Sequence, residues 1–311
     1  MEHRFLGTTE LRVSPLGLGT VELGMPYGLG LPPPPPEADS IRLLHRAFDL
    51  GIHFFDTAAA YGRSEEVLGR AFAGSIARPV LATKVTLKDQ PQGPLLQGAA
   101  LRQHIEDSVQ RSLRHLGRET LDLLQVHSAG DHFLSEELAA ILKDLRERGW
   151  VRYWGASTYG QAAPVEVLDA GAGCGSLQVA YSLLDRTLEG EVFPRIHQQG
   201  MGLILRSIFL KGVLSERLET LPARLDPLRA AALQAHSLAA QAGLSLPALA
   251  LRFAAYCPFA DVTLFGTPSL QELEANIAAF AQGPLPPEVI ARIQALQVQD
   301  VRLLNPGNWE R

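Results

Sequence analysis

The chain has 311 residues, of which 46% are hydrophobic, which is enough to bury a large core and excludes a disordered or fibrous protein. Its 28 basic and 33 acidic residues give a formal net charge of −5 and are spread along the sequence. Without a basic patch or a polybasic stretch, the sequence favours neither nucleic acid nor a membrane as a partner. We therefore expect a small-molecule partner.

The cysteines and the N-terminal segment bear on the cellular compartment. Cys174 and Cys257 lie far apart in the sequence and have neither metal-site nor disulfide spacing, so we expect reduced thiols. The N-terminal segment carries charges early and lacks an apolar core of signal-peptide length, and no later run approaches about 20 apolar residues. These features predict a cytoplasmic protein.

Short β-like runs alternate with longer helical patterns along the chain. The eight predicted strands cover residues 16–20, 52–56, 80–84, 121–127, 151–157, 177–182, 202–207 and 261–266. In the first predicted helix, Ile41, Leu44 and Phe48 fall on one face. Asp39 or Ser40 can cap its start.

Glycines fall where the helices are expected to end. These glycines are Gly51, Gly117, Gly149, Gly171, Gly200 and Gly243. The proline-rich residues 28–39 predict a stiff, polyproline-like surface loop rather than a linker, because the strand and helix pattern continues across it. Residues 286–297 predict a final helix that covers one rim.

Eight strands with a helix after nearly every one predict a (β/α)8 TIM barrel with an extra C-terminal helix, and we expect residues 1–311 to form this single domain. A doubly wound open sheet is the alternative. Its first strand would lead through a G-x-G-x-x-G fingerprint directly into a helix. The sequence GLGTVELGMPYG at residues 17–28 lacks that fingerprint, so the barrel is the economical interpretation.

Four polar residues lie at or just after three of the predicted strands, where a parallel barrel places its catalytic groups. They are Asp56, Tyr61, Lys84 and His127. Taken singly, the aspartate could cap a turn, the lysine could be solvated and the histidine could be structural. Their joint occurrence indicates a reaction centre.

The chemistry available to this quartet is specific. A tyrosine phenol, with a pKa near ~10, is a poor acid at neutral pH unless a cation stabilises its anion. Lys84 can be that cation, Asp56 would hold it in place, and His127 can orient a substrate oxygen. Tyr61 would protonate an alkoxide forming from a carbonyl, or deprotonate an alcohol in the reverse direction. No metal is needed, but none of these groups supplies hydride, so we expect a redox cofactor beside them.

Six segments resemble the successive signature segments of the aldo-keto reductase superfamily, in order and over nearly the whole chain. They are GIHFFDTAAAYGRSEEVLG (51–69), VLATKV (80–85), LDLLQVH (121–127), WGASTYG (154–160), QVAYSLLDR (178–186) and GTPSLQELEANI (266–277). The resemblance implies a TIM barrel, nicotinamide-dependent carbonyl reduction or alcohol oxidation, and a catalytic tetrad of Asp56, Tyr61, Lys84 and His127.

The resemblance also implies where NAD(P)(H) would bind. Ser157 and Gln178 would hydrogen-bond the nicotinamide carboxamide, Tyr181 would stack on its ring, residues 205–212 would wrap the pyrophosphate, and residues 266–276 would line the adenosine end. The cofactor-binding residues so implied are Gly19, Thr20, Asp56, Ser157, Thr158, Gln178, Tyr181, Arg206, Ser207, Leu210, Gly212, Gly266, Thr267, Ser269 and Asn276.

Two of these assignments have ordinary structural alternatives. Tyr181 could be a core tyrosine whose hydroxyl has a partner. The segment GTPSLQELEANI could simply be a capped helix, with Thr267 or Ser269 as the cap. The second alternative is compatible with cofactor binding, because a helix N-terminus is itself an anion site.

Three positions depart from the family pattern. Thr158 stands where an asparagine commonly follows the serine, and Ala275 stands where an adenine-binding acid is expected. Glu272 stands where members that prefer the 2′-phosphorylated cofactor usually have arginine or lysine. Since an acid repels a phosphate dianion, Glu272 favours NAD(H) over NADP(H), and NADP(H) stays open.

Two other functions are compatible with parts of the sequence. One is a regulatory or scaffolding barrel that binds nicotinamide nucleotide with little turnover. The other is a metal-dependent hydrolase that uses His127, Asp131 and His132. For the reductase, the apolar content of the loops near the strand ends predicts a small to medium carbonyl or alcohol substrate that is not polyanionic.

Overall fold

A closed barrel of parallel strands forms the centre of the structure. The computed structural model describes residues 1–28, 30, 32–75, 78–90, 93–130 and 133–309, and within these residues eight parallel strands close in the order β10-β3-β4-β5-β6-β7-β8-β9. The barrel strands are β3 (Leu16–Gly19), β4 (Phe54–Asp56), β5 (Val80–Val85), β6 (Leu121–Ala129), β7 (Val151–Thr158), β8 (Ser176–Ala180), β9 (Gly202–Arg206) and β10 (Val262–Gly266). Each overlaps a predicted strand, so the predicted TIM barrel is confirmed.

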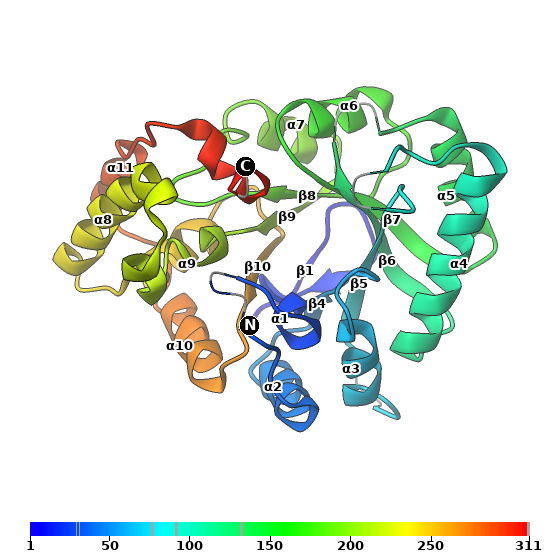
Figure 1. Cartoon of the computed structure of the whole chain (residues 1–311), viewed down its shortest axis with the longest axis horizontal. Helices are drawn as coiled ribbons and strands as arrows, with labels where there is room; N and C mark the ends of the chain where they lie inside the picture. Colours follow the sequence, from blue (N-terminus) through cyan, green and yellow to red (C-terminus); the bar gives the residue numbers. More distant parts are fainter. Residues whose placement is uncertain (29, 31, 76–77, 91–92, 131–132, 310–311) are drawn as a thin grey trace.

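Helices follow the strands and ring the barrel (Figure 1). The α-helices are α1 (Val21–Gly24), α2 (Glu37–Asp49), α3 (Ser64–Ala71), α4 (Gly98–Leu116), α5 (Glu136–Glu147), α6 (Ala162–Ala170), α7 (Val192–Gln198), α8 (Asp226–Gln241), α9 (Leu246–Ala255), α10 (Leu270–Ala281) and α11 (Pro287–Gln294). Short 3-10 segments are η1 (Leu210–Gly212), η2 (Glu216–Thr220), η3 (Ala223–Leu225), η4 (Val301–Leu304) and η5 (Pro306–Asn308). All the predicted helix-ending glycines have a positive φ, from 56° at Gly171 to 94° at Gly51.

The start of α2 differs from the prediction. The helix begins at Glu37, directly after Pro36, so Asp39 and Ser40 lie in its first turn instead of before it. The backbone N–H groups of Asp39 and Ser40 both donate to the carbonyl oxygen of Pro36. No side chain caps this helix, because its N-cap residue, Pro36, has no side-chain atom that could accept a hydrogen bond.

A hairpin that the sequence analysis missed fills the amino-terminal end of the barrel. Strands β1 (Arg4–Phe5) and β2 (Arg12–Val13) pair antiparallel. Leu6, Leu11 and Val13 are buried against barrel residues such as Phe54 and Ile204. Strands of two residues are too short to produce a periodic signal. The hairpin leaves the opposite end, where the strands terminate, as the place for a site.

No single helix in the described part of the chain is both long enough and apolar enough to cross a membrane. One pair of segments, Ala223–Gln241 and Leu246–Ala255, passes the length and composition test together but is bent by 91°.

The packing of α3 on α4 gives a test of the fold at a position remote from the strand ends. A Cβ on Gly69 of α3 would lie 2.0 Å from the carbonyl oxygen of His115 in α4. Gly69→Ala should therefore lower the free energy of unfolding by about 1–3 kcal/mol, although alanine in an open helix stabilises by about 0.5–1 kcal/mol. Gly190→Ala, where a Cβ meets nothing within 4 Å, is the control. Urea unfolding checks both, and a Gly69→Ala protein as stable as the control would contradict this packing.

Candidate active site

Four side chains predicted as a reaction centre lie together at the carboxyl ends of the barrel strands. Asp56 ends β4, Lys84 lies in β5 and His127 in β6, while Tyr61 lies in the turn between β4 and α3. The Lys84 Nζ is 2.5 Å from an Asp56 carboxylate oxygen and 5.0 Å from the centroid of the Tyr61 ring. The rings of Tyr61 and His127 meet edge to face, with 5.4 Å between centroids. The structure thus gathers the predicted tetrad.

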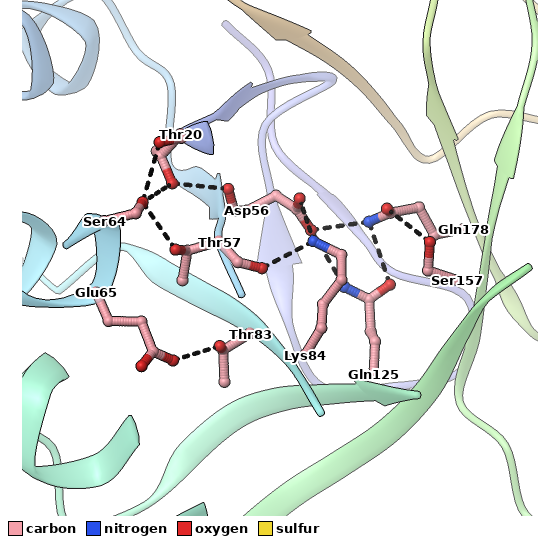
Figure 2. A network of polar contacts seen from close by, with 10 residues as sticks. All are labelled: Thr20, Asp56, Thr57, Ser64, Glu65, Thr83, Lys84, Gln125, Ser157 and Gln178. Atoms are coloured by element: carbon pink, nitrogen blue, oxygen red, sulfur yellow. Dashed lines mark hydrogen bonds and ion pairs between the residues drawn. The ribbon is translucent and has the colours of Figure 1, made fainter. Parts of the chain in front are cut away.

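The Asp56 carboxylate is the centre of a buried polar network (Figure 2). Its Oδ2 accepts from Lys84 Nζ, and its Oδ1 accepts from Gln178 Nε2 at 2.8 Å and from Gln125 Nε2 at 3.2 Å. The second N–H of Gln178 faces the Gln125 Oε1 at 3.2 Å. Ser157 Oγ donates to Gln178 Oε1 at 3.2 Å. One carboxylate therefore joins side chains from strands β5, β6 and β8.

Hydroxyl groups behind the site hold the turn that carries Tyr61. Ser64, the first residue of α3, accepts a hydrogen bond from Thr57 Oγ1 at 2.9 Å, and its Oγ is 2.7 Å from Thr20 Oγ1. Thr20 Oγ1 also donates to the backbone oxygen of Asp56 at 3.0 Å. These buried contacts link the ends of β3 and β4 to the start of α3 (Figure 2). The short turn is thereby anchored at both of its ends.

The structure explains why a glycine follows Tyr61. Gly62 has a φ of 55°, in the left-handed region that glycine adopts without steric cost. A Cβ at this position would also lie 2.4 Å from the carbonyl oxygen of Gly24. The turn therefore requires glycine next to Tyr61, both for its backbone conformation and for the close approach of α1.

Burial controls the electrostatics of the tetrad. Burial lowers the pKa of Lys84, and its contact with Asp56 opposes that shift. Burial raises the pKa of Tyr61, Asp56 raises it further, and Arg206 lowers it. Burial lowers the pKa of His127 to about 3, with Lys84 and Arg206 adding to the shift. The imidazole is therefore neutral at physiological pH and can act as both donor and acceptor.

A cavity of about 790 Å³ opens in front of the tetrad. The predicted site residues that line it are Gly19, Thr20, Asp56, Tyr61, His127, Ser157, Gln178, Arg206, Ser207, Gly212, Gly266 and Asn276. Pro306 and Gly307 also line it, so the segment beyond α11 reaches the cavity. The predicted final helix, α11, packs against α8 instead.

Other predicted residues lie behind the cavity wall. Lys84 is buried behind Asp56, and Leu210 packs in the hydrophobic core. Thr158 is buried with no hydrogen-bond partner for its Oγ1 within the described residues. Thr267 Oγ1 donates to Glu272 Oε2 at 2.5 Å, and the Ser269 hydroxyl accepts from the Glu272 N–H and caps α10. The capped-helix interpretation of this segment is confirmed for Ser269.

The structure contradicts the predicted position of Tyr181. Its ring is 2% exposed, stacks on Phe253 with 5.4 Å between centroids, and contacts Phe193. Its hydroxyl donates to Glu189 Oε1 at 3.0 Å. Tyr181 follows the end of β8, and its side chain turns outward into the core between the barrel and the helices. It is the core tyrosine of the alternative interpretation, because the aromatic cluster buries the ring away from the cavity.

Several residues of the site were missed by the sequence analysis. Gln125 lies two positions before His127 on the same strand, and this i, i+2 spacing of polar residues in an apolar run was an available signal. Glu22, Tyr27 and Tyr159 also line the cavity. They come from loops and from the short α1, for which the sequence offers no comparable periodic signal.

Metal binding has little support in the described part of the chain, where no group of three or more His, Cys, Asp or Glu side chains could hold an ion. Asp131 and His132, predicted as alternative ligands with His127, lie outside the described residues. Cys174 and Cys257 are buried and unpaired. Burial raises the pKa of Cys174 to about 12, so this thiol stays protonated.

The buried ion pair predicts a large effect on stability. Asp56→Asn leaves the Lys84 ammonium, 1% exposed, without its counter-charge and should lower the free energy of unfolding by about 3–5 kcal/mol. The double variant Asp56→Asn/Lys84→Met removes the charge and should recover most of that loss. Asp39→Asn, which breaks an exposed pair with Arg42, is the control, expected within about 0.5 kcal/mol. Urea unfolding of all variants measures this; equal effects at Asp56 and Asp39 would contradict the buried pair.

Comparisons with known proteins place this barrel in a family. Residues 15–298 match the model described as the Aldo/keto reductase family. Aldo-keto reductase YhdN of Bacillus subtilis is 30% identical over 296 residues, covering 88% of this chain and 87% of that protein. Pyridoxal 4-dehydrogenase of Microbacterium luteolum is 29% identical over 325 residues, covering 90% and 93%. The solved structure of aldo-keto reductase AKR11C1 from Bacillus halodurans, in its holo form, has a TM-score of 0.78 at 28% identity and covers 95% and 96% of the two chains. The chain therefore belongs to the aldo/keto reductase family of oxidoreductases.

Proposed function

We propose that this protein is an NAD(P)(H)-dependent oxidoreductase that reduces an aldehyde or ketone to an alcohol, or catalyses the reverse reaction, with Tyr61 as the general acid or base. The observation that carries the proposal is the shared position of Tyr61, His127 and Asp56 on one large cavity, with Lys84 buried against them and paired with Asp56. The similarity to a protein named as a dehydrogenase supports including the oxidative direction.

The polar groups of the cavity fit a nicotinamide nucleotide. Gln178 uses both of its N–H groups on Asp56 and Gln125, so its Oε1, which accepts from Ser157, keeps one lone pair facing a ligand. A carboxamide N–H can bind there. The bound nucleotide would supply or accept the hydride, which no side chain here can do. The cavity, at about 790 Å³, is in the range of cofactor sites.

The tetrad divides proton transfer from orientation. Tyr61 lines the cavity, so its hydroxyl can reach a substrate oxygen and give or take the proton. His127 is neutral, since its pKa is lowered by burial to about 3, and its imidazole can hydrogen-bond the same oxygen without competing as an acid. Lys84 stays behind the cavity surface, and its pairing with Asp56, a nearly buried residue of the cavity wall, fixes the geometry. Catalysis would thus use one proton donor held against a rigid, buried support.

The far end of the cavity favours NAD(H). Glu272 lines the cavity, and its carboxylate accepts a hydrogen bond from Thr267 Oγ1 at 2.5 Å. Glu22 lines the same cavity, and a Cβ on Gly266 would lie 2.7 Å from its Oε2. Burial raises the pKa of Glu22 to about 7, with Glu272 adding to the shift and Arg217 opposing it. The Glu272 carboxylate would repel a 2′-phosphate, and Glu22, with a pKa of about 7, adds part of a negative charge near neutral pH. A ribose hydroxyl, in contrast, can donate to a carboxylate.

Removing the Tyr61 hydroxyl tests the proposed chemistry. Tyr61→Phe should leave unfolding and nucleotide affinity nearly unchanged and lower kcat by about 10²- to 10⁴-fold, the usual contribution of general acid–base catalysis. Tyr153→Phe, whose hydroxyl accepts from the Glu10 N–H away from the cavity, is the matched control. Steady-state rates with a proven aldehyde or alcohol give the answer. Near-normal turnover by Tyr61→Phe would rule out the role, and nucleotide binding without any turnover by the native protein would favour a regulatory barrel.

Parallel titration with NADH and NADPH, followed by fluorescence, tests the cofactor assignment. We expect the native protein to bind NADH about tenfold more tightly, a difference of ~1.4 kcal/mol. Glu272→Arg should reverse or abolish that preference by attracting the 2′-phosphate. Glu288→Arg makes the same charge change on the exposed face of α11 and should leave the ratio of dissociation constants unchanged. Tighter binding of NADPH by the native protein would overturn the assignment.

A further inference from the structure

Arg206 brings a fixed positive charge to the reaction end of the cavity. It is the last residue of β9, and it lines the same cavity as Tyr61 and His127. Its Nη2 donates to the backbone oxygen of Thr158 at 2.8 Å, and its guanidinium carbon lies 4.2 Å from the centroid of the Tyr159 ring. These contacts tie the guanidinium to the end of β7. Arginine stays protonated at any pH that the fold survives.

The Lys84–Asp56 pair is poorly suited to be the only source of positive charge for Tyr61. Opposite charges 2.5 Å apart partly cancel at a third group, since each contributes in inverse proportion to its distance. Lys84 gives its other hydrogen bond to the Thr57 carbonyl oxygen at 2.8 Å, and among the described residues it makes none to the Tyr61 hydroxyl. The ammonium lies 5.0 Å from the centroid of the Tyr61 ring. Arg206, in contrast, has no ion pair within the described part of the chain.

We propose that Arg206 is a positioning residue for the proposed reaction. Its uncompensated charge stabilises the Tyr61 phenolate, which the Lys84–Asp56 pair alone stabilises too weakly. The inference rests on the proposed function, because it assigns the phenolate a role in proton transfer. It also moves Arg206 from the predicted pyrophosphate segment to the reaction centre. Its action is electrostatic and passes through Tyr61, so it needs no contact with the substrate.

The surroundings of Tyr61 are consistent with this role. The titratable and charged groups that face it are Asp56, Lys84, His127, Tyr27, Tyr159 and Arg206. Burial and then Asp56 raise the pKa of Tyr61, and Arg206 is the group that lowers it. Arg206 also acts on Asp185: burial raises the pKa of this carboxyl group, and Arg206 helps to lower it. The hydrogen bonds that the Asp185 carboxylate accepts, however, come from Thr187.

Other cations are available for the pyrophosphate. Lys211 and Arg217 line the cavity in and after η1. Lys211 lies over the ring of Tyr27 at 5.4 Å, and Arg217 lies near Gly28, since a Cβ there would be 3.3 Å from its Nη1. These two residues form a second basic region, contributed by the 3-10 segments η1 and η2 instead of a strand end. Charge on the phosphates therefore does not require Arg206.

The test uses an uncharged substrate, 4-nitrobenzyl alcohol, with NAD⁺, so that Arg206 has no substrate charge to bind. In this direction Tyr61 must be deprotonated, so the rate rises with pH up to the phenol pKa. Loss of the Arg206 charge raises that pKa and moves the rising limb to higher pH. Arg206→Met and Arg206→Gln should shift the limb by about one pH unit, which is about a tenfold lower rate at a fixed pH on the limb. Arg206→Lys should keep the limb within a few tenths of a unit.

Nucleotide affinity separates this role from the alternatives. The Arg206 variants should bind NADH with a dissociation constant within about threefold of the native value, measured by fluorescence, whereas Arg217→Met should weaken NADH binding and leave the pH limb in place. The glutamine variant retains a donor for the Thr158 carbonyl and guards against a loss of folding in the methionine variant. The role of Arg206 is overturned if the Arg206→Met and Arg206→Gln variants keep the native pH limb, or if they lose only NADH affinity. A native protein that binds NADH but oxidises and reduces nothing overturns the proposed function itself, and this inference with it.

Discussion

The carboxylate of Asp56 is the constraint on which the rest of the site depends. A charge that is almost completely buried is costly unless it is paired and hydrogen-bonded, and Asp56 meets that requirement with Lys84, Gln125 and Gln178. These partners come from three other strands, so the pairing is satisfied only when the barrel closes in the correct register. The interaction that solvates one carboxylate therefore also fixes the wall of the cavity, including Ser157, which bonds Gln178.

In this arrangement, some side chains hold the site together from behind the cavity wall, and others face the cavity. The Lys84 ammonium and the Gln125 amide are buried behind the cavity surface, whereas Tyr61 and His127 line it. Groups that are locked by buried partners lose little further entropy during a reaction. Lys84 and Asp56, however, carry no net charge as a pair, and Asp56 raises the pKa of Tyr61, so a net positive charge near Tyr61 must come from outside the pair. Arg206 is such a charge, held at the end of β9 by a backbone carbonyl of β7.

The sequence was sufficient to predict the barrel and the proximity of Asp56, Tyr61, Lys84 and His127 because both depend on local patterns. Parallel strands place their last residues on one face, so Asp56, Lys84 and His127 could be brought together from strand ends alone. The prediction for Tyr181 was wrong because the direction of its side chain depends on an aromatic cluster with Phe253, which is remote in sequence. The orientation of Arg206 was equally hidden, since it is set by a hydrogen bond to a different strand. The hairpin was missed because its strands are two residues long.

The charged side chains of the cavity come from several segments that are far apart in the sequence. The guanidinium of Arg206 lies close enough to Tyr61 to lower its pKa, Lys211 and Arg217 come from η1 and η2 after β9, and Glu22 lies close to Gly266 and interacts with Glu272. Cations beside the middle of the cavity suit a ligand with phosphates in its middle, and carboxylates at one end suit hydroxyl donors. Because Glu22 comes from α1 and Glu272 from α10, the acidic end forms only when β3 and β10 pair, as they do in register from Leu16 to Gly19. Closing the barrel therefore also assembles the acidic part of the cavity, which we propose favours NAD(H) over NADP(H).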